Sequence, residues 1–243
     1  MKKHNIFFTL LLLCALVSSS IAQDNEINIP LTTPGNQGQL QVEIHSGPVT
    51  VKGTNRTDVL LRYEEKKDKQ KYKKGKKNSG LKRISGGGLS LEISEKDNEV
   101  IIESSNHHKM VRLYIEVPTN FDLDINTHHN GEVNISDIKG EVVVESHHGG
   151  ITATNINGSV VANTWHGAII VSFSGITPDT PLAFSTYHGE IDISLPTNTK
   201  ADLKMQSEAG EIFSSFDVDL KKLTKTQKRE ENGMFRIKMD NWI

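Results

Sequence analysis

The chain has 243 residues, a formal net charge of −2 and a single cysteine, Cys14. One cysteine excludes a disulfide framework, so burial and backbone pairing must stabilise the fold. The length is compatible with one all-β domain, and the aromatic content of 6% suits narrow aliphatic coils better than a broad globular core.

The N-terminus has the pattern of a secretory signal peptide over residues 1–22. Two lysines precede an apolar run over residues 6–17, and the small residues Ser20 and Ala22 predict cleavage before Gln23. The apolar run is too short for a membrane span. We therefore expect an exported protein, in the periplasm, on the outer surface or secreted, with no transmembrane segment after cleavage and no intracellular nucleic-acid partner.

The first half of the remaining chain predicts irregularly spaced strands. Residues 23–38 form a polar leader that can end in a short strand. Alternating apolar residues predict strands over residues 40–44, 49–51, 59–63, 89–93, 100–103 and 111–117. Pro118 follows the last of these strands and prevents it from continuing as a central strand.

A basic, glycine-rich insert over residues 64–88 interrupts this pattern. Between Arg62 and Arg83 there are eleven basic and three acidic residues. Such a block repels itself and predicts a solvated loop. The alternative is that Lys66–Lys77 contacts an anionic surface.

Residues 121–216 contain regular repeats. A glycine followed by alternating apolar residues recurs five times, with steps of 18, 18, 22 and 21 residues. A second apolar pair lies seven and five residues before each glycine from Gly149 onward. The motifs read Gly131-Glu-Val-Asn-Ile, Gly149-Gly-Ile-Thr-Ala, Gly167-Ala-Ile-Ile-Val, Gly189-Glu-Ile-Asp-Ile and Gly210-Glu-Ile-Phe-Ser, with an outlying copy at Gly47-Pro-Val-Thr-Val.

This periodicity predicts an all-β, single-chain β-solenoid over residues 39–243. A single coil cannot bury its inner face, whereas stacked coils can. The apolar spacing does not fit the six-residue step of a left-handed hexapeptide helix. We expect coils of 18–22 residues that form two or three sheets, with right-handed winding by the crossover rule.

Several segments resemble the bacterial "putative adhesin" family of unknown function, which is built from β-strand repeats. The resemblance runs from about Leu40 to the end of the chain. It implies a secreted or surface β-solenoid, and it transfers no catalytic residue. The segments that carry it are Val117-Pro118, Phe121-Asp-Leu-Asp-Ile, the stretch from Asn130 to Val144, Ser159-Val-Val-Ala-Asn-Thr and Ala183-Phe-Ser-Thr-Tyr-His-Gly-Glu-Ile-Asp-Ile.

Histidines occupy the positions before the motif glycines, where similar proteins usually have serine or asparagine. Stacking would align several of them in one column at ~4.8 Å spacing. Neutral imidazole is a ligand for Zn²⁺ or Cu²⁺, so the column is a candidate metal site, but no carboxylate or cysteine recurs beside it. The alternative is that they are exposed turn residues. The candidates are His128, His129, His147, His148, His166 and His188.

Two questions about this corner stay open from the sequence. Side chains alternate between the two faces of a strand. If this alternation is continued from the upstream strand, the side chain before the glycine is predicted to face inward; if it is continued back from the downstream strand, that side chain is predicted to face outward. Trp165 and Tyr187 lie two residues before their glycines. Corner packing is favoured for both over a platform for stacking sugars.

Three functions are compatible with these features. The first is a non-catalytic envelope or surface protein that presents a solenoid face to a polymer or protein. The second is a metal-binding envelope protein. The third is a polysaccharide-active enzyme, which needs clustered carboxylates. Glu132, Glu190 and Glu211 each follow a motif glycine, but Gly150 and Ala168 interrupt the series, so we expect no catalytic site and no other cofactor.

Overall fold

The computed structural model describes residues 26–66, 91–104, 109–197, 199–208, 210–215, 219–221 and 235–238. These ranges contain strands and turns but no helix, which confirms the all-β prediction. Accordingly, the described part of the chain has no helix long and apolar enough to cross a membrane. The predicted signal peptide and most of the lysine-rich insert lie outside the described residues, so export and anionic-surface binding stay predictions.

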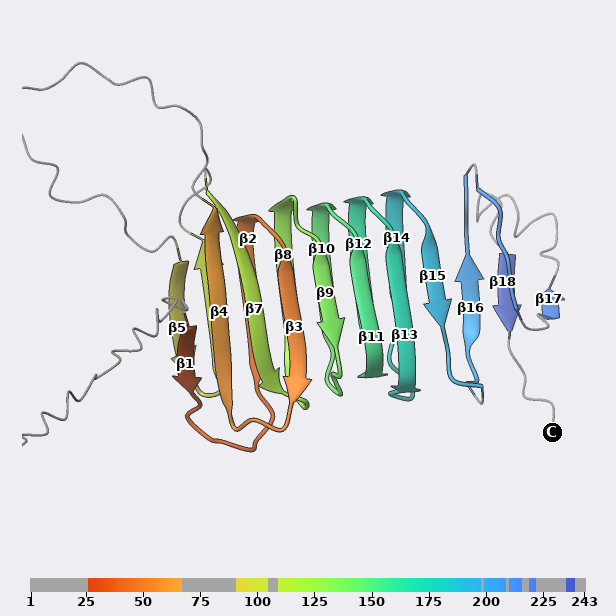
Figure 1. The fold of residues 1–243 in the computed structure, drawn as a ribbon. Coiled ribbons are helices and arrows are strands. Elements are labelled where there is room, and N and C mark those ends of the chain that lie inside the picture. Colours follow the sequence, from red (N-terminus) through yellow and green to blue (C-terminus); the bar gives the residue numbers. More distant parts are fainter. Residues whose placement is uncertain are drawn as a thin grey trace, which may run out of the picture.

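The strands form three sheets, two of which lie against each other along the stack (Figure 1). Sheet A contains, in spatial order, β1 (Glu26–Pro30), β4 (Asp58–Lys66), β7 (Met110–Pro118), β3 (Val49–Thr54), β9 (Val133–Ser136), β11 (Ile151–Gly158), β13 (Ile169–Ile176) and β15 (Ile191–Ser194). Sheet B contains β14 (Ala183–His188), β12 (Val160–His166), β10 (Val142–His148), β8 (Asp122–His129), β2 (Gln39–Ser46), β6 (Glu99–Ser104) and β5 (Leu91–Lys96). Sheet C contains β16 (Asp202–Met205), β18 (Phe235–Lys238) and β17 (Asp219–Lys221).

From β8 to β15 the chain forms a two-sheet, solenoid-like stack. It passes alternately through sheet B and sheet A, and neighbouring strands in each sheet are parallel and belong to successive coils. Val142 pairs with Val160, and Ile151 pairs with Ile169. Equivalent residues of successive coils therefore lie above one another, as the repeat predicts.

The core consists of apolar ladders between the two sheets. In sheet B one ladder runs through Val42, Ile125, Val144 and Ala162, each at most 1% exposed. A matching ladder in sheet A runs through Val51, Ile135, Ala153 and Val171. Inward side chains from both faces thus fill the space between sheets, and burial of this apolar surface drives folding.

The order of the coils in space differs from their order in sequence. The coil β2–β3, which carries the outlying Gly47 motif, lies between the β6–β7 and β8–β9 coils. Val42 pairs with both Ile102 and Ile125, and Val51 pairs with both Ile115 and Ile135. This coil is therefore an internal member of the regular stack rather than one of the irregular strands that we expected to precede it.

Antiparallel strands close the N-terminal end of the stack. Two consecutive predicted strands pair as the hairpin β5–β6, and its turn residues Asp97 and Asn98 have φ values of 56° and 65°. The Asn98 side chain is 3% exposed and exchanges two 2.7 Å hydrogen bonds with the backbone of Thr33. Glu95 accepts hydrogen bonds from the backbone N–H and the hydroxyl of Thr32. The hydrogen bond from this N–H is the main cause of the lowered pKa of the Glu95 carboxyl. These contacts anchor the segment between β1 and β2.

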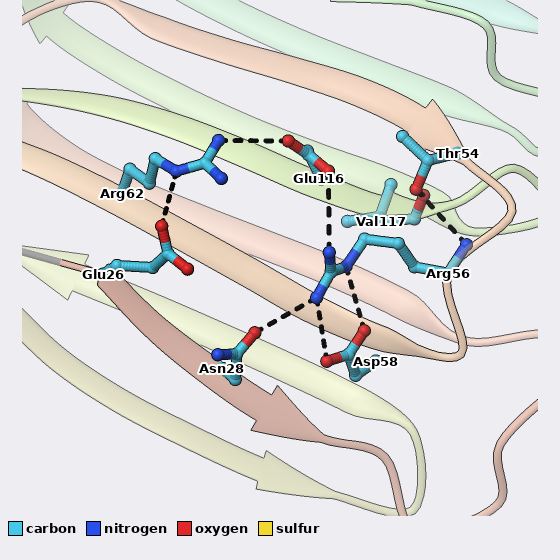
Figure 2. A network of polar contacts seen from close by, with 8 residues as sticks. All are labelled: Glu26, Asn28, Thr54, Arg56, Asp58, Arg62, Glu116 and Val117. Atoms are coloured by element: carbon cyan, nitrogen blue, oxygen red, sulfur yellow. Dashed lines mark hydrogen bonds and ion pairs between the residues drawn. The ribbon is translucent and has the colours of Figure 1, made fainter. Parts of the chain in front are cut away.

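A network of ion pairs ties β1 to β4 and β7 on the outer face of sheet A (Figure 2). Arg62 donates to Glu26 at 2.7 Å and to Glu116 at 3.2 Å, and the Glu26 hydrogen bond is the main cause of its raised pKa. Arg56 donates to Asn28 at 3.1 Å and lies 3.8 Å from Glu116. Such exposed pairs contribute at most about 1 kcal/mol each, so this network positions the edge strand more than it stabilises the whole fold.

The prediction that Gly210 begins a fifth coil is wrong. β16 contains the predicted Leu203–Met205 strand, but it pairs antiparallel with β18 in sheet C instead of adding to sheet B. Residues 211–214 after the glycine form no strand. The stack consequently ends on β14 and β15, where Ile191 is 42% exposed although its equivalent Ile169 is buried. Among the described residues no further coil packs on β14 and β15, so inward-facing side chains of these strands are accessible to solvent.

Candidate functional site: a double row of rings at one corner

The corners that follow β10, β12 and β14 repeat one arrangement of residues. The segments Ser146-His-His-Gly149, Thr164-Trp-His-Gly167 and Thr186-Tyr-His-Gly189 each contain a hydroxyl residue, an aromatic or imidazole ring, a histidine and a glycine. The corner of β8 has the same residues with Asn130 added before its glycine, and Asn130 takes a φ of 50°. Ile125 and Val133 are therefore one residue farther apart in sequence than the equivalent Val144 and Ile151. The extra left-handed residue absorbs this difference, so the neighbouring coils stay in register.

The corner glycines allow adjacent backbones to touch. The N–H groups of Gly131, Gly149 and Gly167 donate to the carbonyls of His148, His166 and His188 at 2.9–3.0 Å. A Cβ on Gly149 would lie 2.5 Å from the carbonyl carbon and oxygen of Gly131. Glycine is therefore required by close backbone approach between coils.

The hydroxyl residues form a polar ladder inside the corner. Ser146 donates to the carbonyl of Gly131 at 3.1 Å, and Thr164 and Thr186 donate to the equivalent carbonyls of Gly149 and Gly167 at 2.9 and 3.0 Å. Ser146 and Thr164 are buried. Satisfying these carbonyls fixes the strand ends, so the following rings are held at defined positions. This ladder was not predicted, although its signal is present in the sequence: Ser146, Thr164 and Thr186 each lie three positions before a motif glycine.

Outside the corner, nine side chains form two parallel rows of rings, which we call the ring ladder. Neighbouring ring centroids within a row lie 4.8 to 5.9 Å apart. The first row contains His45, His128, His147, Trp165 and Tyr187, and the second row contains His129, His148, His166 and His188.

All six histidines proposed from the sequence belong to the ring ladder, and every one of them is exposed. The inward–outward alternation of side chains stops at the end of β10, so His147 and His148 both face solvent. The residue before the motif glycine therefore points outward. His45 also belongs to the ladder, and the sequence analysis missed it because it lies in the outlying coil. Only the spatial order of the coils brings it beside His128.

The stacking of Trp165 and Tyr187 limits what they can bind. Their ring centroids are 4.8 Å apart with 21° between the planes, and they are 49% and 64% exposed. His147 stacks on Trp165 at 5.9 Å and 7°. Trp165 therefore has a ring against each face and turns its edge toward solvent, which favours partners that meet the ring edge over sugars that stack on the ring face. Tyr187 is the last described ring of the row, and no other described ring stacks on its second face.

Two histidines of the ring ladder, His147 and His166, have lowered pKa values. The pKa of His147 is lowered first by desolvation and then by the positive charges that His148, His128, His129 and His166 would carry. The pKa of His166 is lowered by desolvation and by His148 and His188. The Nδ1 atoms of His147 and His148 lie 2.9 Å apart, a hydrogen bond in which one ring is the donor and the other the acceptor.

Acidification is therefore expected to destabilise the fold. As pH falls below about 6.5, unfolded histidines take up protons before His147 and His166 do, so stability is present above that pH and is lost as pH falls through the lowered pKa values. The unfolding temperature should fall between pH 7.5 and 5.5, measured with a chelator present. The double variant His147→Gln/His166→Gln should show a smaller fall. An equal fall in both proteins would contradict this origin of the pH dependence.

The described residues include no group of three His, Cys, Asp or Glu side chains already arranged to hold a metal ion. The ring ladder brings the histidine candidates together, but their rings lie beside one another rather than around one point. Metal binding thus stays a prediction, and it would need rotation of these exposed side chains.

Comparison with known proteins gives one family and one remote structural neighbour. Residues 2–240 match the family described as Toastrack DUF4097. No curated protein sequence matches the chain. A solved structure of a "putative cell adhesion protein" from Clostridium sporogenes ATCC 15579 is similar, with 11% identity, a TM-score of 0.43 and coverage of 70% of this chain and 99% of that chain. At this similarity nothing about function is transferred.

Proposed function

The chain belongs to the Toastrack DUF4097 family, which confirms the predicted β-repeat family, and on this premise we propose that it is a non-catalytic, exported surface or envelope protein. Its solenoid presents one sheet face to a polymer or protein partner. The observation that carries this proposal is the continuous outer face of sheet B. Export is supported by the signal-peptide pattern of residues 1–22.

The outer face of sheet B gathers exposed apolar and aromatic side chains in rows. Val143 and Val161 pair in register and are 38% and 36% exposed. On the same strands and the next one, Trp165 and Tyr187 continue the face at the corner. The exposed Glu145 and Asn163 pair on the same face between these two apolar pairs, so the face combines apolar and polar groups as protein interfaces do.

The positions of the carboxylates support a non-catalytic role. Glu132 and Glu190 immediately precede the paired positions of β9 and β15, and the two coils between them carry Gly150 and Ala168. Three coil steps of ~4.8 Å separate the two glutamates by roughly 14 Å. Paired-carboxylate hydrolysis needs a separation of about 5–9.5 Å, so this pair does not form such a site.

For the finer architecture we propose right-handed winding with coils of 18–22 residues. Pairing of Val142 with Val160 and of Val161 with Ala183 corresponds to steps of 18 and 22 residues. Right-handed crossovers between parallel strands are the rule in proteins.

A binding assay tests the surface role. The protein should retain a ligand on a glycan array or capture a partner from envelope extracts, and Trp165→Ala/Tyr187→Ala should reduce retention at least tenfold. Ile170→Ala is the matched control, because Ile170 is 44% exposed but belongs to β13 of the other sheet. Equal retention by both variants would contradict binding through sheet B. A parallel arm with chelator separates this role from metal binding.

A further inference from the structure

The densest part of the ring ladder is a square of four imidazoles from two adjacent coils. His128 and His129 end β8, and His147 and His148 end β10. The ring centroids are 4.9 Å apart for His128–His147, 5.4 Å for His129–His148, 5.4 Å for His128–His129 and 4.6 Å for His147–His148. His45 extends the square, with centroids 5.6 and 5.2 Å from His128 and His129. The next positions of the first row are occupied by Trp165 and Tyr187, so only this part of the ring ladder has imidazoles in both rows.

Two nitrogens of the square already lie close together. His147 Nδ1 and His148 Nδ1 are 2.9 Å apart and share one hydrogen. In a tetrahedral zinc site with Zn–N bonds of 2.0–2.1 Å, two ligand nitrogens lie about 3.3 Å apart. For an ion to replace the hydrogen, both rings must turn so that their Nδ1 lone pairs converge. The donor ring must also change tautomer, giving up the Nδ1 proton and taking one up at Nε2, so that both rings stay neutral.

The surroundings favour a cation at this position. Glu43 and Glu145 are exposed and lie two residues before His45 and His147. Because side chains alternate along a strand, both carboxylates share the outer face with these rings. Their negative charge attracts a cation without requiring that they become ligands.

We propose that the imidazole square binds one divalent transition-metal ion of the class that prefers nitrogen ligands, such as Cu²⁺ or Zn²⁺. His147 and His148 form the first pair, and His128 or His129 from the adjacent coil supplies the third nitrogen after rotation of its exposed ring. Imidazole donors select such ions over Ca²⁺ and Mg²⁺, which prefer oxygen ligands. Ion binding concerns the chain alone and does not depend on the surface role proposed above.

Calorimetry with CuSO₄ or ZnCl₂ at pH 7.5 tests the proposal on the purified protein. We expect one ion per chain, no comparable heat with CaCl₂, and at least a tenfold weaker affinity for His147→Gln/His148→Gln. His188→Gln is the matched control, because it removes an exposed second-row histidine whose first-row neighbour is Tyr187, and it should bind as the unmodified protein does. At pH 5.5 binding should weaken, because imidazole must lose its proton to coordinate.

Electron paramagnetic resonance of the Cu²⁺ form supplies a second readout, in which hyperfine structure from at least two nitrogens is expected and is lost in the double variant. Far-ultraviolet circular dichroism verifies that the variants fold. If the double variant does not fold, His147→Gln alone replaces it, since His147 is exposed. Absence of binding heat with both ions, or unchanged binding in the folded variant, would overturn the proposal.

Discussion

Replacing Phe121 by alanine is expected to lower the free energy of unfolding by about 3–5 kcal/mol, the range for deletion of a buried phenylalanine. Phe121 is 0% exposed and lies where the chain crosses from β7 to β8 past the inserted β2–β3 coil. Its ring approaches Gly38 so closely that a Cβ there would lie 2.5 Å from Cζ. The alanine variant leaves a cavity that this surrounding backbone cannot collapse to fill. Urea denaturation measures the loss.

The matched control is Phe213→Ala. Phe213 is 83% exposed, so its removal should change the free energy of unfolding by less than about 0.5 kcal/mol. A loss below about 1 kcal/mol for Phe121→Ala would show that the crossover is not a packed part of the core.

Replacing Gly149 by alanine should be almost as damaging, at about 3 kcal/mol. The new Cβ would lie 2.5 Å from the carbonyl carbon and oxygen of Gly131 and 2.7 Å from the backbone nitrogen of Glu132. All of these atoms are backbone atoms of the neighbouring coil, so no side chain can rotate to relieve the overlap. The two coils must move apart, which weakens the hydrogen bond from Gly131 N–H to the carbonyl of His148 and the packing beside it.

The adjacent glycine is the control for this substitution. A Cβ on Gly150 would meet the carbonyl oxygen of Ala168 at 3.2 Å and no atom closer, and the next coil has Ala168 at the equivalent position. Gly150→Ala should therefore stay within about 1 kcal/mol of the unmodified protein. Thermal unfolding followed by circular dichroism compares the two variants, and equal unfolding temperatures would contradict the steric explanation.

Much of the regular stack could be predicted because its signal is local and repeated. Val142 and Val144 before Gly149, and Ile151 after it, alternate in one coil and recur in the next, so strands, facing and register follow from the pattern. The column of His148, His166 and His188 followed from the same register. Each of these inferences compares neighbouring copies and needs no knowledge of distant contacts.

Other features depended on contacts that no local pattern contains. The Gly210 segment keeps the apolar spacing, yet β16 pairs with β18. His45 lies far from His128 in sequence and becomes its neighbour because β2 lies beside β8. The facing of His148 could not be predicted because alternation ends at the corner, where the backbone turns between the two sheets.

By itself the sequence determined that this protein is a stack of β-coils with aliphatic ladders inside, because alternation and a recurring glycine are properties of each coil. Tertiary structure alone decided the order of the coils, the end of the stack and the membership of the ring ladder. These depend on which strand edges pair, and pairing energy is set by residues far apart in the chain. The candidate site is consequently a property of stacking: the two exposed rings of each coil become a square of imidazoles only when β8 and β10 lie side by side.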